Sequence, residues 1–149
     1  MALHALLNIE QCTLGELINL GADYLDRADL VFGHGTDNPT DEAAWLVLEA
    51  CGLSPVEPVN DFDVVVNQGH LARAKNWFRR RAEQHEPVAY ITGRAWFAGL
   101  EFATDARALI PRSPIAELIT KLISRGCRRY PTPYLTCAAV VAVSPLPAR

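Results

Sequence analysis

The stretch from Glu86 to Leu118 constrains the fold most, because strand-forming, turn-forming and helix-starting residues follow one another within it. It opens with a short run of good strand formers, Val88, Tyr90 and Ile91, which favours an extended segment. The Thr-Gly pair that follows is a turn signal and ends the run. The chain is therefore expected to change direction before the next segment begins.

Two further runs in this stretch predict a β-hairpin. Residues 94–98 and 101–104 flank Gly99 and Leu100. A two-residue connection with glycine first suits a tight turn, because glycine adopts positive φ at low cost. The two runs carry aromatic side chains, so one face of the hairpin is expected to bury aromatic surface. These side chains are Trp96, Phe97 and Phe102.

The same stretch ends in the signature of a helix start. Residues 109–111 are expected to be extended, because the residue before a proline is pushed out of the helical region. Ser113 then suits the N-cap, Pro114 the first helical position and Glu117 the first turn. A helix is predicted over residues 113–123.

Three motifs in this stretch resemble the linker of the HemK/Prm protein-glutamine methyltransferases. That linker has the form PxxYIxG…FxGxxF…LIPR, and residues 87–93, 96–102 and 109–112 match it. The release-factor branch of the family usually has Pro-Glu-Thr after the arginine. This sequence has Ser113-Pro114-Ile115 there, which is similar to the PrmB branch, whose members methylate a glutamine of the large-subunit ribosomal protein uL3.

The resemblance implies a fold, a reaction and partners. The family has a helical N-terminal substrate-recognition domain, joined by a β-hairpin to a Rossmann-like α/β methyltransferase domain. The implied cofactor is S-adenosylmethionine, whose methyl group passes to the side-chain amide of one glutamine. The implied partner is uL3 or a ribosome assembly intermediate, and neither DNA nor a membrane is expected as a partner.

The α/β domain of the family is expected to be missing from this sequence. Its site needs a Gly-rich, acidic turn after a first strand, and no such turn occurs. The family's Asn-Pro-Pro-Tyr motif does not occur either, and Asn38-Pro39 lies at a predicted helix start instead. Asp and Glu stop at Glu117 while prolines accumulate, so residues 124–149 are expected to be an aberrant, frameshifted or disordered tail.

The residues before the linker predict a small helical bundle. Thr13 and Glu16 suit a capping box with an apolar stripe behind it, so we expect a helix from Leu14 to Ala28. A second helix is predicted to open with Thr40 as its N-cap and to end at Gly52 in the left-handed region. Its residues are apolar nearly all round, which is typical of a buried helix.

A third helix is predicted from Gln68 to Glu83. Its buried stripe steps by three and four residues and consists of Leu71, Ala74, Phe78 and Ala82. Basic residues, Arg81 among them, are expected on its other sides. A basic helix with aromatic residues could contact ribosomal RNA, but a solvated face is favoured, since a net charge of −3 argues against a dedicated nucleic-acid binder.

Few residues are candidates for a catalytic or metal-binding role. His34 has no second ligand or base beside it in the sequence, so a plain loop histidine is favoured, and Cys51 is expected to be a small core residue for the same reason. The cysteines lack metal-ligand spacing and no secretory signal is recognised, which indicates reduced thiols in a cytoplasm. Arg112 and Ser113 match the junction motif of the family, and both are expected to have structural roles. No catalytic, cofactor-binding or metal-binding residue is assigned.

The sequence therefore predicts a mainly α chain with a helical recognition domain over residues 1–86 and a β-hairpin linker over residues 87–112. A helix over 113–123 and a tail over 124–149 are expected to follow. The function implied by the resemblance is that of the N-terminal part of a uL3 glutamine methyltransferase, inactive by itself. The alternative is a non-catalytic helical module that binds a ribosomal protein or a ribosome assembly intermediate.

Overall fold

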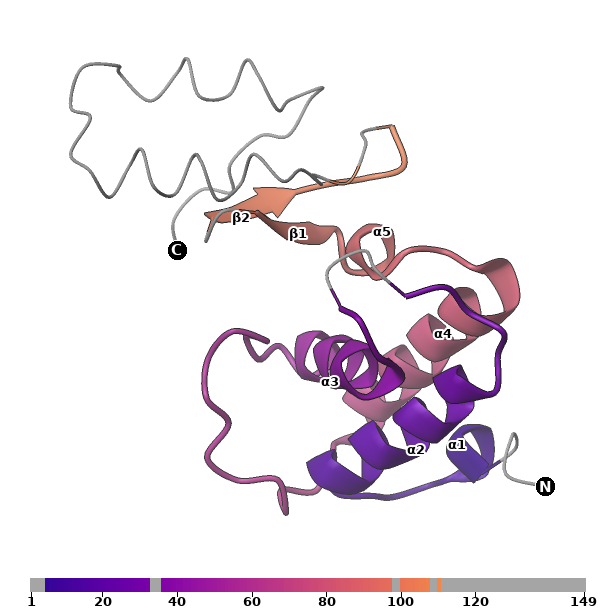
Figure 1. Cartoon of the computed structure of the whole chain (residues 1–149). Helices are drawn as coiled ribbons and strands as arrows, with labels where there is room; N and C mark the ends of the chain where they lie inside the picture. The colour runs from indigo at the N-terminus through magenta and orange to yellow at the C-terminus, as the bar shows by residue number, and fades with distance from the viewer. Residues whose placement is uncertain (1–4, 33–35, 98–99, 108–109, 111–149) are drawn as a thin grey trace. The chain divides into compact units, whose positions relative to one another are not determined.

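The computed structural model describes residues 5–32, 36–97, 100–107 and 110. These residues form five helices and one two-stranded sheet (Figure 1), so the mainly α fold is confirmed. The chain divides into two compact units, Met1–Thr92 and Gly93–Arg149. The predicted helix over 113–123, the expected tail and His34 lie outside the described residues.

The first unit begins with the short helix α1 (Ala5–Asn8) and the longer α2 (Leu14–Asp26). The capping box is confirmed: the Glu16 N–H donates to Thr13 Oγ1 at 3.3 Å, and the Thr13 N–H donates to Glu16 Oε2 at 2.9 Å. The helix ends before the expected Ala28. Asp29 adopts a left-handed φ of 42° shortly afterwards, which turns the chain away.

The second long helix, α3, spans Pro39–Ala50, and its predicted N-cap was wrong. Asn38 is the N-cap instead of Thr40, because its side chain accepts the Asp41 N–H at 2.8 Å. Pro39 then occupies the first turn, where its missing N–H costs no intrahelical bond. The expectation for Gly52 is confirmed, since it follows the helix with a left-handed φ of 76°.

The third long helix, α4, spans Gln68–Gln84, one residue beyond the predicted end. Its predicted stripe is confirmed, since Leu71, Ala74 and Phe78 are buried and Ala82 packs against them partly buried. Asn67 is its N-cap, whose side chain accepts the His70 N–H at 2.8 Å. His85 is its C-cap and adopts a left-handed φ of 53°.

The expected extended segment after Glu86 was wrong, because Val88–Thr92 forms the short helix α5. The Pro87 carbonyl accepts the N–H groups of Tyr90 and Ile91 at 2.9 and 3.1 Å. Val88, Ala89 and Ile91 are buried, and α5 packs against α3 and α4. Burial of this apolar face outweighs the strand preference of the individual residues.

The second unit contains the predicted hairpin, with β1 (Arg94–Phe97) antiparallel to β2 (Leu100–Ala103). The predicted connection was wrong by one residue. Phe97 pairs with Leu100, so residues 98 and 99 connect the strands instead of residues 99 and 100. The Thr104 N–H donates to the Gly93 carbonyl at 3.0 Å and closes the open end of the hairpin.

The core of the first unit lies where α2, α3 and α4 pack together (Figure 1). Tyr24 on α2 meets Phe78 on α4 edge to face, with ring centroids 6.5 Å apart. Gly21 lies directly under the Phe78 ring, because a Cβ at this position would be only 2.2 Å from the ring. The largest fully buried side chains are Leu6, Leu17, Leu25, Leu46, Val47, Leu71 and Phe78.

Arg81 was predicted to lie on the surface of the third helix, and this was wrong. Its side chain is buried and forms an ion pair with Glu42 at the start of α3. It also donates to the Val31 carbonyl at 3.2 Å and lies over the Phe32 ring. The Thr36 hydroxyl donates to the same Glu42 carboxylate at 3.1 Å, so both charges have several partners.

Removal of one charge from this pair should destabilise the first unit. Arg81→Met leaves Glu42 buried without its cation, so we expect the free energy of unfolding to fall by about 3–5 kcal/mol. Arg79→Met is the matched control, because Arg79 and Glu83 are exposed and 3.9 Å apart, and we expect a loss below about 1 kcal/mol. Urea denaturation measures both, and equal losses would contradict the buried pair.

A methyl group added under the Phe78 ring should also destabilise this unit. Gly21→Ala forces the ring or the helices to move, which costs about 1–3 kcal/mol. Gly69→Ala is the control, because its Cβ would meet no atom closer than 3.4 Å and alanine favours a helix. Thermal unfolding should show a lower Tm for the first variant and an unchanged or higher Tm for the second. A Tm for Gly21→Ala equal to that of the parent chain would refute the close packing.

Candidate functional site

The candidate site lies along residues 51–67, which connect α3 to α4 and are called the connector below. The connector returns along the first turn of α2 and bonds to its backbone. Leu14 N–H donates to the Val64 carbonyl at 2.9 Å, and Gly15 N–H donates to the Phe62 carbonyl at 2.9 Å. These bonds satisfy amide groups that a helix start otherwise leaves without partners.

A third backbone bond completes a short antiparallel bridge. Val66 N–H donates to the Cys12 carbonyl at 3.0 Å, so Thr13 and Val65 lie opposite each other. Val66 is buried, whereas Val64 and Val65 are more than half exposed, at 54% and 53%. The connector is thus fixed at its end by α2 while most of its apolar side chains remain in contact with solvent.

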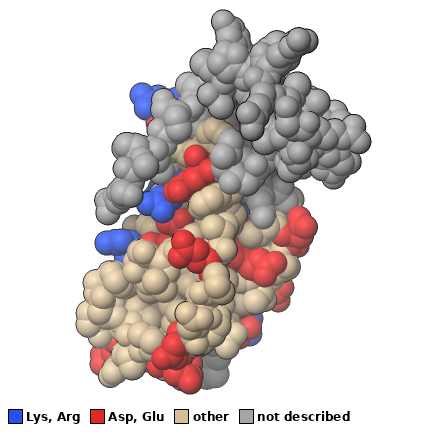
Figure 2. All heavy atoms as spheres, turned by 90° about the vertical axis from the view of Figure 1, so that its left-hand side faces the viewer, with Lys and Arg blue, Asp and Glu red and all other residues tan. Residues whose placement is uncertain are grey.

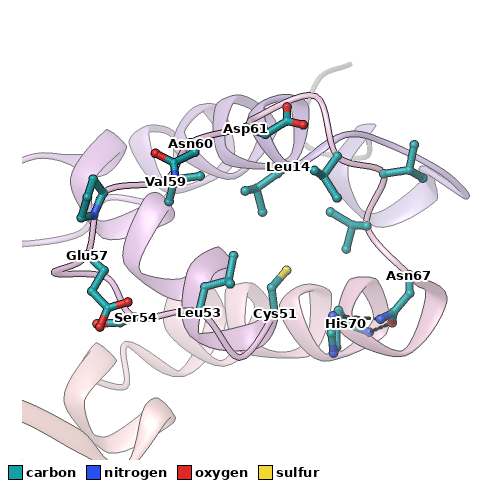
Figure 3. A pocket seen from close by; sticks show the side chains of 14 residues that line it. Leu14, Cys51, Leu53, Ser54, Glu57, Val59, Asn60, Asp61, Asn67 and His70 are labelled. Carbon is teal, nitrogen blue, oxygen red and sulfur yellow. Dashed lines mark hydrogen bonds between the residues drawn. The ribbon is translucent and has the colours of Figure 1, made fainter.

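A hollow of about 500 Å³ lies between the connector and the helices that it joins. Leu14 from α2, together with Cys51 and Leu53 from the start of the connector, points into it (Figure 3). Glu57 and Asp61 lie at its rim. We call this hollow and its rim the connector groove. Its lining is largely apolar, as in most binding sites for organic ligands and peptides.

The connector carries most of the exposed large apolar side chains of the described residues. Such a concentration on one segment marks an interaction surface, whereas isolated exposed apolar residues are ordinary. These side chains are Leu53, Val56, Phe62, Val64 and Val65. The groove is therefore the candidate binding surface of the described residues.

The connector is also acidic. Glu57, Asp61 and Asp63 lie on it, and residues 52–67 include no Lys or Arg. Figure 2 shows the face of the molecule that bears this loop, where uncharged surface is interspersed with Asp and Glu. The Asp61 carboxylate accepts the Asp63 N–H at 2.9 Å and holds this part of the loop in a turn.

The groove holds two residues of chemically active types, Cys51 and His70, in unreactive settings. Burial raises the pKa of the Cys51 thiol, nearby Cys12 raises it further, and Arg73 opposes the shift. His70 is engaged at the start of α4, where its Nδ1 lies 3.0 Å from Asn67 Nδ2. A nucleophilic cysteine needs a lowered pKa and a base, so this arrangement favours binding over catalysis.

The described residues do not fit S-adenosylmethionine. Such a site needs a glycine turn between a strand and the helix that follows it. Gly15, Gly21 and Gly69 lie inside helices, Gly52 follows α3, and Gly93 precedes β1. Within the same ranges, no group of three or more potential metal ligands is found. No helix in this part of the chain is long and apolar enough to cross a membrane.

The residues matched to the family linker are divided between the two units. Residues 88–92 form α5 in the first unit, residues 94–97 and 100–103 form the hairpin in the second, and Arg112 and Ser113 lie outside the described residues. The connector was not predicted as a site. The sequence did hold a signal for this site. Apolar and acidic residues occur together there in a proline-containing loop that lacks the three- and four-residue spacing of a helix.

A comparison with models of protein families shows which family the chain belongs to. Residues 16–93 match the model described as the PrmC N-terminal domain. The chain belongs to the PrmC N-terminal domain family. The matched range contains α3, α4, α5 and the connector, so the groove lies within the family domain.

Three proteins similar to this chain carry the same name. A "Ribosomal protein uL3 glutamine methyltransferase" of Xylella fastidiosa (strain Temecula1) is 49% identical over 112 residues, which are 72% of this chain and 34% of the relative. Proteins of the same name from Xanthomonas campestris pv. campestris and Bordetella pertussis are 46% and 40% identical. They too align with 72% of this chain, and with 35% and 36% of their own lengths.

The resemblance to the HemK/Prm family and its PrmB branch is thus confirmed for the N-terminal part of the chain. The chain spans about a third of the length of the curated relatives that it matches.

The raised pKa of Cys51 predicts slow alkylation in this family member. At neutral pH its thiolate fraction is below that of an ordinary cysteine, so iodoacetamide should react with Cys51 several-fold more slowly in the native chain than in urea. Quantitative mass spectrometry of the Cys51 peptide measures both rates. Equal rates in the two conditions would contradict the burial of this thiol.

Proposed function

We propose that this chain is the N-terminal, substrate-binding part of a methyltransferase that modifies a glutamine side chain of ribosomal protein uL3. The observation that carries the proposal is the 40–49% identity to proteins of that name over 72% of the chain. The match includes both the helical unit and residues beyond it. The whole protein would act in the cytoplasm with S-adenosylmethionine as methyl donor.

The role of this chain in such a protein is to hold the substrate. A glutamine amide is a poor nucleophile, so the reaction depends on fixing the amide nitrogen against the methyl donor. Binding energy collected by a separate domain serves that positioning. The connector groove offers apolar and acidic surface for this purpose, and its lining residues lie on a bundle with a fully buried core.

The chain alone is expected to bind uL3 without transferring a methyl group, since its described residues do not fit the methyl donor. Purified uL3 and the full chain should form a complex detectable by titration calorimetry, with no cofactor added. Ribosomal RNA should compete poorly, because the groove and the chain as a whole carry negative charge. Binding to RNA in preference to uL3 would contradict the proposed role.

A chimera tests the proposal directly. Residues 1–112 of this chain replace the matching region of the Xylella fastidiosa relative, and radiolabelled S-adenosylmethionine reports methylation of uL3. We expect the chimera to label a glutamine of uL3, because the aligned segments of the two proteins are 49% identical. A folded chimera that binds S-adenosylmethionine but neither binds nor labels uL3 would refute a role in uL3 recognition. Complex formation without labelling would leave a non-catalytic ribosomal-protein-binding module as the function.

A further inference from the structure

We propose that the connector groove binds an extended, basic peptide segment of the substrate, which adds as a strand beside Val65. The proposal rests on the proposed function, and it names the part of the domain that makes the contact and the chemistry of the segment that it takes.

The backbone of the connector offers a free strand edge at Val65. Its neighbours Val64 and Val66 use their carbonyl and N–H to bond the start of α2. Since successive residues of a strand point their backbone groups to opposite sides, the N–H and carbonyl of Val65 face away from α2. Within the described ranges neither group has a hydrogen-bond partner. Peptides commonly bind proteins by pairing with such an edge.

The side chains around this edge suit the apolar residues of an added strand. Val64 and Val65 are exposed at 54% and 53%, and Leu53 at 44%. Leu14 and Cys51 form the inner lining of the hollow beside them. In an extended peptide alternate side chains point to the same side, so one set can enter the hollow while the other set remains at the rim.

The charges at the rim select a basic peptide. Glu57, Asp61 and Asp63 have no cation among residues 52–67 to balance them. Glu57 and Asp61 line the groove and are exposed to solvent, so their attraction for Lys and Arg is weakened by salt. Ribosomal proteins hold RNA phosphates largely through Lys and Arg, so segments of uL3 offer this charge. Nucleic acid itself would be repelled.

The test uses overlapping short peptides that cover uL3, with affinities for the full chain measured by fluorescence anisotropy. We expect the tightest binding from net-basic peptides with alternating apolar residues, and weaker binding as salt is raised. Strand addition also predicts that N-methylation of alternate peptide amides lowers affinity roughly fivefold, since the peptide N–H that donates to the Val65 carbonyl is lost. Tight binding of neutral or acidic peptides, or indifference to N-methylation, would overturn the proposal.

Matched variants locate the contact. The double variant Glu57→Gln and Asp61→Asn removes both rim charges and keeps an acceptor for the Asp63 N–H, so the loop turn is preserved. We expect it to bind the basic peptides about fivefold more weakly. The control, Asp23→Asn with Asp26→Asn, removes two exposed acids from the far end of α2 and should leave affinity unchanged. Circular dichroism establishes that both variants fold.

Cys51 gives a second readout of the same contact, since it lines the groove. A bound basic peptide should slow the alkylation of Cys51 in the parent chain, and an acidic peptide of equal length should not. If intact uL3 binds the rim variant as tightly as the parent and leaves Cys51 reactive, the groove is not the contact, although the proposed function stands. If uL3 does not bind the parent chain and the chimera leaves uL3 unlabelled, the proposed function itself fails.

Discussion

Backbone pairing between the connector and the first turn of α2 is the constraint on which the connector groove depends. The first turn of a helix has amide groups that need acceptors, and here the Val64 and Phe62 carbonyls supply two of them. The same bonds fix the loop that carries the exposed apolar and acidic residues. A stabilising requirement of α2 thereby fixes residues 62–66 of the connector, so a peptide that pairs with them would meet a preformed edge.

Features set by local chemistry could be predicted from the sequence. The capping box at Thr13 and Glu16 and the buried stripe of α4 depend on residues three or four apart, and both were confirmed. The choice between Asn38 and Thr40 as N-cap depends on which side chain reaches an amide of the first turn. Both residues suit the role, so composition alone did not separate them.

Features set by distant partners could not be predicted in this way. Val88–Thr92 is helical because its apolar face is buried against α3 and α4. The strand preference of the individual residues does not include this contact with distant helices. Arg81 is buried because Glu42, far away in the sequence, supplies its counter-charge. The connector groove exists because residues 62–66 meet residues 12–15, and only the three-dimensional structure brings these two segments together.

The most direct test of substrate binding at this surface is an amide chemical-shift map of the ¹⁵N-labelled chain as unlabelled uL3 is added. The account predicts the largest changes at residues 53–66 and in the first turn of α2, with the Val65 amide among them. Changes confined to the outer, basic side of α4, with the connector unaffected, would contradict it.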